Sequence, residues 1–155
     1  MKTNIAEGFH KEFEAYRSCL ANTIRSLSDD DWTKGKEPRA MPVHQVCHMI
    51  SVIARYAHST SNYSGILFGW KPQPKYPSRR DLLKLIDGIW KDVASYINDV
   101  AARTLMERDW SVPPLPKLVY LFRHSVWHLA CLGEELRARG LRMPSYLHSL
   151  RRKRS

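Results

Sequence analysis

One stretch organises this chain: Leu118-Val-Tyr-Leu-Phe-Arg-His124-Ser-Val-Trp-His128-Leu-Ala-Cys-Leu-Gly-Glu-Glu-Leu-Arg137. We expect this stretch to form the last helix of the core. His124 and His128 are four residues apart, so a helix places them one turn apart on the same face. Two imidazoles in this arrangement can bind one metal ion together, at a separation that the helix sets. A third ligand must come from another part of the chain.

Three amphipathic segments precede this helix. Apolar residues at spacings of three and four predict helices over residues 4–27, 42–63 and 78–100. The second helix begins with Pro42, a residue favoured in the first turn. The third begins with Ser78-Arg-Arg-Asp81, a short-armed version of the capping box.

Prolines and one glycine bound the last helix. Pro113-Pro-Leu-Pro116 precedes it, Gly140 is placed to end it, and Pro144 follows. Four amphipathic helices predict an all-α protein built as a four-helix bundle, a fold that commonly holds metal sites between facing helices. We assign residues 1–144 to this bundle and residues 145–155 to a basic C-terminal tail.

Two irregular connections are expected between these helices. Residues 28–40 read as an acid-rich turn followed by a polar loop. Residues 64–77 are rich in Gly, Pro and aromatic residues, and such long loops often form lids or pocket walls. We expect Trp90, Trp127 and the aromatic loop around Trp70 to serve in packing rather than as substrate platforms, with the loop as the best exception.

The composition is that of one globular domain. The chain has 155 residues, of which 43% are hydrophobic. Cys19, Cys47 and Cys131 each lie in an apolar helical pattern, where a free cysteine packs as a small hydrophobe rather than forming a disulfide framework. No apolar run is long enough to span a membrane, so we expect no membrane association. Charged residues come too early at the N-terminus for a signal peptide, and we expect a cytoplasmic protein.

The net charge of +10 is concentrated near the C-terminus. Seven basic residues and no acidic residue follow position 136. A nucleic-acid-binding surface would spread Lys and Arg over the folded domain with aromatic residues between them, so we do not expect nucleic acid as the partner. The segment Arg151-Arg-Lys-Arg154 leaves open an interaction with an acidic partner.

The second helix offers the third ligand. His48 is our candidate, and His44, one turn earlier, is the alternative. At about 100° per residue, His48 lies at the edge of the apolar stripe of that helix, whereas His44 is expected on the helix surface. We expect His10, His58 and His148 to be solvated, because none of them has a partner at a useful spacing.

Two segments resemble the DinB/YfiT-like family of metal-binding four-helix bundles. From His124 to Pro144 the chain is similar to the last helix of that family, which carries His-x-x-x-His, often an aromatic residue before the second His, and an Arg-rich end with Gly and Pro. Pro42-Val-His-Gln-Val-Cys-His48-Met-Ile-Ser-Val-Ile-Ala-Arg-Tyr56 looks like its second helix, which supplies one histidine. The resemblance covers most of the chain in helix order.

The resemblance implies a divalent metal, zinc or nickel, bound by His48, His124 and His128. Family members of known activity are largely thiol-dependent transferases or isomerases that use a low-molecular-weight thiol, and hydrolases have also been proposed. Many are homodimers. We therefore expect a metal-dependent enzyme with a small-molecule substrate, acting as a transferase or a hydrolase, and a homodimeric assembly.

The chain departs from the family directly after the second histidine. Leu129-Ala130 follow His128, where the family often has Gly-Gln or Gly-Glu. A shift that brings Gly133-Glu134 into that place would discard both histidines and make Cys131 a ligand. Two roles for Cys131 therefore stay open, a metal ligand and a small buried residue. Two roles also stay open for Glu135: a hydrogen-bond acceptor that orients an imidazole, and a surface carboxylate.

Three functions remain open on these grounds. The first is a metal-dependent transferase or hydrolase. The second is a bundle that binds a metal or another ligand without catalysis. The third is an interaction protein that binds acidic partners through its basic tail.

Overall fold

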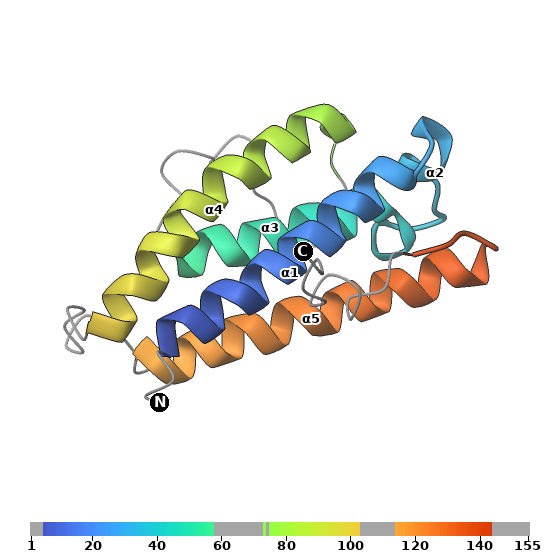
Figure 1. Ribbon diagram of the computed structural model, residues 1–155. Coiled ribbons are helices and arrows are strands. Elements are labelled where there is room, and N and C mark those ends of the chain that lie inside the picture. The colour runs from blue at the N-terminus through green and yellow to red at the C-terminus, as the bar shows by residue number, and fades with distance from the viewer. Residues whose placement is uncertain (1–4, 58–72, 74, 103–113, 144–155) are drawn as a thin grey trace, which may run out of the picture.

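The computed structural model describes residues 5–57, 73, 75–102 and 114–143. Within these residues every regular element is helical (Figure 1), which confirms the all-α prediction. The elements in chain order are α1 (Ile5–Ser26), α2 (Asp29–Thr33), the 3-10 helix η1 (Pro38–Ala40), α3 (Pro42–Tyr56), α4 (Arg79–Ala102) and α5 (Pro114–Ala138).

The four longer helices pack against one another. Helices α1 and α3 each contact both α4 and α5, and α4 also contacts α5. Each helix therefore buries its apolar stripe against two or more neighbours, which is how an amphipathic helix gains most of its stability. This packing is what a helical bundle requires, while the DinB/YfiT-like form of the bundle remains a prediction.

Large side chains fill the core between α1 and α4. The rings of Tyr16 and Trp90 stack with centroids 5.9 Å apart and planes 9° from parallel. The indole Nε1 of Trp90 donates a hydrogen bond to the Phe13 carbonyl at 3.1 Å, so its polar edge is satisfied although the ring is buried. The expectation that Trp90 serves in packing is confirmed.

A short helix lies where the sequence predicts only a turn and loop. The Ser28 hydroxyl accepts a hydrogen bond from the Asp31 amide at 3.0 Å and caps α2. Three aspartates lie in the first turn, where their negative charges interact favourably with the positive end of the helix dipole. Trp32 is buried, and its Nε1 donates to the Pro77 carbonyl at 3.1 Å. The burial of Trp32 and its hydrogen bond stabilise α2, which is too short to be stable alone.

The C-terminal end of α5 follows the sequence prediction. Gly140 has a φ of +74°, the left-handed conformation that glycine adopts without strain. The Gly140 amide donates to the Arg137 carbonyl and the Leu141 amide to the Leu136 carbonyl, both at 2.9 Å. These two bonds are those of a Schellman motif, so Gly140 ends the helix as expected.

Two further hydrogen bonds tie the end of α5 to the segment before α3. The Arg139 guanidinium donates to the Lys34 carbonyl at 2.8 Å and also to the Ala40 carbonyl. Since this segment leads directly into Pro42, the contacts help to set the position of α3 relative to α5. That relative position decides where the histidines of the two helices meet.

Several sequence predictions fall outside the described residues. They concern the second helix beyond Ala57, most of the loop over residues 64–77, Pro144 and the basic tail over residues 145–155. In the part of the chain that is described, no helix is long and apolar enough to cross a membrane.

Candidate metal centre

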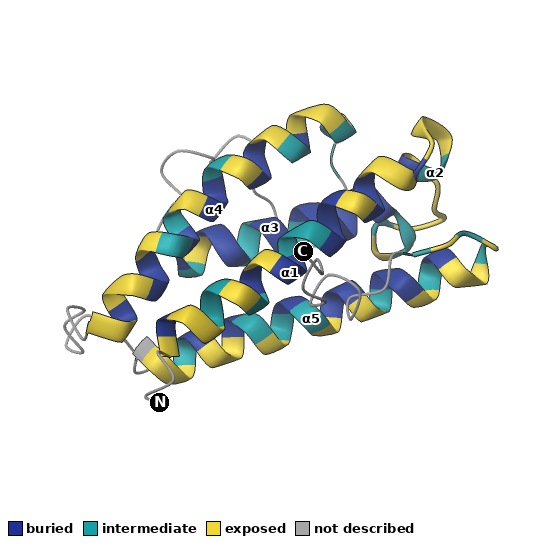
Figure 2. Cartoon of the chain, in the orientation of Figure 1, coloured by how far each residue is buried: buried dark blue, intermediate teal, exposed yellow. Residues whose placement is uncertain are grey.

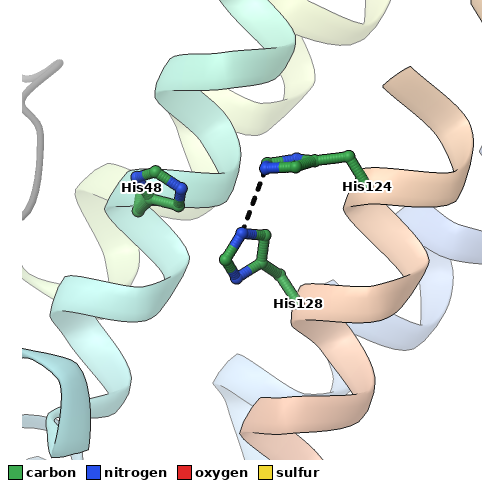
Figure 3. A group of neighbouring side chains, drawn as sticks. All are labelled: His48, His124 and His128. Atoms are coloured by element: carbon green, nitrogen blue, oxygen red, sulfur yellow. Dashed lines mark hydrogen bonds between the residues drawn. The ribbon is translucent and has the colours of Figure 1, made fainter. Parts of the chain in front are cut away.

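Three histidines from two helices meet between α3 and α5. His48 projects from α3, and His124 and His128 project from α5 toward it (Figure 3). Each offers one ring nitrogen, and the three nitrogens all lie within 4.8 Å of one another. The predicted ligand set is therefore brought together by helices that are far apart in the sequence.

The two histidines of α5 already have the spacing of ligands to a common ion. Their Nε2 atoms are 3.1 Å apart. Two nitrogens bound tetrahedrally to zinc at 2.0–2.1 Å would be about 3.3 Å apart. The ring of His48 lies with its centroid 4.7 Å from that of His128 and 5.9 Å from that of His124. The three side chains could together hold a metal ion.

Burial keeps these imidazoles neutral. Burial, followed by the charges of His124, His44 and Arg39, lowers the pKa of His48 to about 4. Burial followed by the charges of His124 and His48 lowers the pKa of His128 to about 4. The pKa of His124 is also lowered by burial. Because a neutral imidazole is the form that binds metal, the site is ready for an ion at pH 7 without first losing protons from charged histidines.

His44 does not join this cluster. It is fully buried, and its Nδ1 lies 3.0 Å from the Tyr76 hydroxyl. The expectation that His44 lies on the helix surface is wrong. Helix α3 is packed by α2, η1, α4 and α5, so its first half is buried on nearly every side (Figure 2). A helical wheel assumes that one face of a helix is exposed to solvent, so it cannot show that a helix is packed on several sides.

The other candidate residues lie outside the triad. Cys131 is half-buried and does not belong to the metal-binding group. Glu135 forms an ion pair with Arg139, with Oε2 and Nη2 3.9 Å apart. The ring nitrogen Nε2 of His10 lies 2.8 Å from Asn98 Oδ1, so His10 links α1 to α4 instead of being simply solvated. His58 and His148 fall outside the described residues.

Aromatic residues flank the triad on α5. Tyr120 lies one turn before His124, with ring centroids 5.6 Å apart, and Trp127 meets His128 edge-on at 4.7 Å. Trp127 is 60% exposed, so the expectation that it serves in core packing is wrong. Sequence reasoning did not single out Tyr120, although its spacing of four from His124 is a usable signal.

Family models, curated proteins and solved structures were compared with the chain, and none matches. The family resemblance described above therefore stays a prediction that rests on its own short motifs.

Proposed function

We propose that this protein is a metal-dependent enzyme of the DinB/YfiT type, acting as a thiol-dependent transferase or a hydrolase on a small-molecule substrate. The single observation that carries the proposal is the convergence of His48 with His124 and His128 within 4.8 Å. Zinc and nickel are the ions that the family resemblance implies, and three imidazoles suit both because both bind nitrogen ligands.

The number of ligands favours a catalytic rather than a structural ion. Structural zinc sites are closed by four protein ligands, whereas catalytic sites keep an open position beside three. The described residues supply three histidines to this site. The folded core also buries its own apolar surface, so the protein does not need a metal to fold in the way a zinc finger does.

In catalysis the protein itself would hold the metal ion, orient the substrate and exclude water from the site. The helical spacing fixes His124 against His128, and α3 presents His48 from the opposite side. A bound divalent ion would supply the acidity that turns a coordinated thiol or water into a nucleophile at neutral pH. The ring of Trp127 is exposed beside His128 and offers a surface that a substrate would contact.

Metal content tests this proposal. Protein purified without a nickel column should contain, or bind in calorimetry, about one equivalent of zinc or nickel. His48→Ala, His124→Ala and His128→Ala should each abolish retention, because two remaining histidines are too few to hold the ion. All three variants should keep their helical circular dichroism. His10→Ala is the matched control and should bind metal normally, since His10 contacts Asn98 away from the triad.

The opposite results are equally clear. A metal-free protein that also refuses added zinc and nickel would rule out the site. Equal metal content in the triad variants and in His10→Ala would place the ion elsewhere. Metal binding with no change in the spectrum of a cobalt-loaded protein on addition of thiol would exclude the thiol-dependent transferase and leave the hydrolase or a bundle that binds metal without catalysis.

A further inference from the structure

The first residue after α5 binds the segment that leads into α3. The Arg139 guanidinium donates to the Lys34 carbonyl at 2.8 Å and to the Ala40 carbonyl, and its side chain is only 19% exposed. Glu135, one turn earlier on α5, lies with Oε2 3.9 Å from the Arg139 Nη2 and orients the guanidinium from its own helix. We call Arg139 with the two carbonyls the carbonyl clamp. Since a charged donor makes a stronger hydrogen bond than a neutral one, the clamp is a firm link between segments that are far apart in the sequence.

Helix α3 depends on contacts from outside for the position of its first turn. Its N-cap residue is Met41, whose side chain carries no oxygen that could cap the helix. The Gln45 Nε2 instead donates to the Arg39 carbonyl at 2.7 Å. Gln45 from α3 and Arg139 from α5 therefore bind neighbouring carbonyls of η1, those of Arg39 and Ala40. The two helices that carry the triad are joined through this short segment.

The geometry of the triad is sensitive to the rotation of α3 about its own axis. A ring nitrogen lies about 6 Å from the axis of its helix, so a rotation of about 10° would move the His48 ring by about 1 Å. Distances between a metal ion and its ligands tolerate only about 0.2 Å. Hydrogen bonds are more directional than apolar contacts, so the clamp restricts this rotation more closely than core packing does.

Resting on the proposed function, we propose that Arg139 is a positioning residue of the metal centre, which holds the start of α3 against the end of α5 and so sets the affinity of the triad for its ion. Arg139 is not itself one of the three candidate ligands, and it acts through the placement of His48.

A second guanidinium provides a contrast. Arg79 donates to the Asp29 carboxylate at 2.8 Å and to the Leu27 carbonyl. These bonds tie α4 to the junction between α1 and α2. Arg79 therefore links elements of the fold much as Arg139 does, but its link includes neither of the helices that carry the triad.

The zinc affinity of the folded protein tests this assignment. Arg139→Met removes the guanidinium and keeps most of the aliphatic stem. Its zinc dissociation constant, measured by competition with a chelator, should be about tenfold higher than that of the wild type, the lower end of the loss that follows removal of a residue that orients a metal ligand. The ligand-field absorption of the cobalt-loaded variant should also change, because His48 would reach the ion in a different geometry.

Two other arginines supply matched controls. Arg137 lies on the same helix, and its guanidinium binds Glu134 and the Gly133 carbonyl within that helix. Arg137→Met should keep the wild-type zinc affinity. Arg79→Met should lower the midpoint of urea denaturation, as Arg139→Met does, but should keep the wild-type zinc affinity and cobalt spectrum. A contact that serves stability alone would behave like Arg79.

Further variants show whether the clamp acts through the segment before α3. Arg139→Lys keeps an ammonium that can donate to one of the two carbonyls, so it should recover part of the lost affinity. Gln45→Met removes the other side-chain bond to η1 and should also weaken zinc binding. When Gln45→Met and Arg139→Met are combined, the loss should be smaller than the product of the two single losses, because both residues hold the same segment.

The contrary results are distinct from one another. Wild-type zinc affinity and cobalt spectrum in folded Arg139→Met, or in Arg139→Lys if the methionine variant does not fold, would overturn the positioning role and leave the metal site standing. An equal loss of affinity in Arg79→Met would assign the effect to general stability and would overturn the role as well. A wild-type protein that takes up no zinc, nickel or cobalt would overturn the proposed function itself, and the role of Arg139 with it.

Discussion

The ring of Trp127 meets the ring of His128 edge-on, with centroids 4.7 Å apart and planes at 70°. An indole in this position is a fluorophore in contact with a proposed metal ligand. Trp32 and Trp90 are buried and donate their hydrogen bonds to Pro77 and to Phe13, away from the triad. Among the tryptophans in the described residues, Trp127 is therefore the one that can report metal binding locally.

Nickel or cobalt bound at the triad should quench the emission of Trp127, because a transition ion a few ångströms from an indole accepts its excitation energy. Titration of metal-free protein in which Trp70 and Trp110 are replaced by Phe should give a saturable decrease in tryptophan fluorescence. Trp127→Phe should remove most of that decrease, while Trp32→Phe should keep it. Full quenching in the Trp127→Phe protein would mean that the ion binds at a different place.

His44 should matter for stability and not for metal. His44→Ala removes a fully buried ring and its 3.0 Å contact with the Tyr76 hydroxyl. We expect the free energy of unfolding to fall by about 1–3 kcal/mol in urea denaturation. Metal content per folded protein should be unchanged. Loss of metal in His44→Ala together with its retention in His48→Ala would show that the register of α3 is wrong.

The metal-free protein should lose stability in mild acid. The folded-state pKa of His48 and of His128 is lowered to about 4 from an ordinary value of 6.5. Between these two values the unfolded chain binds more protons than the folded one, so stability rises with pH. The free energy of unfolding should decrease as pH falls from 6.5 to 4, by on the order of 1–3 kcal/mol for the two histidines together, less than the full linkage because His48 is only partly shielded from water.

Denaturation midpoints measured across this pH range provide the check. The His48→Gln, His128→Gln double variant should show a flatter profile over the same range, since it lacks both titrating rings. A wild-type midpoint that stays constant from pH 6.5 to 4 would contradict the lowered pKa values.

Two glycines should respond to alanine in opposite directions. A Cβ at Gly8, on the exposed side of α1, would meet no atom within 4 Å, so Gly8→Ala should stabilise the protein by about 0.5–1 kcal/mol. A Cβ at Gly35 would lie 2.7 Å from the Ala40 carbonyl carbon, where backbone must move. Gly35→Ala should therefore cost about 1–3 kcal/mol. Thermal denaturation of both variants measures the two effects, and equal shifts would contradict the close approach of residues 35 and 40.

The sequence alone determined the four long helices and two of the three histidines of the group. Periodic apolar residues, Pro42 and Gly140 mark where helices begin and end, and these signals are local, so the bounds agree within a few residues. The exception is the second helix, which is predicted to reach residue 63 and ends at Tyr56. The placement of His124 next to His128 is also local, because a spacing of four on one helix fixes it.

Only the tertiary structure decided which histidine of α3 completes the group. His44 and His48 lie one turn apart, and the choice depends on how α3 is rotated against α5 and on which neighbours surround its first half. The same packing brought the Tyr76 hydroxyl into contact with His44 and left Trp127 exposed beside His128. Relations between helices arise from contacts distant in sequence, and the pattern within one helix does not contain them.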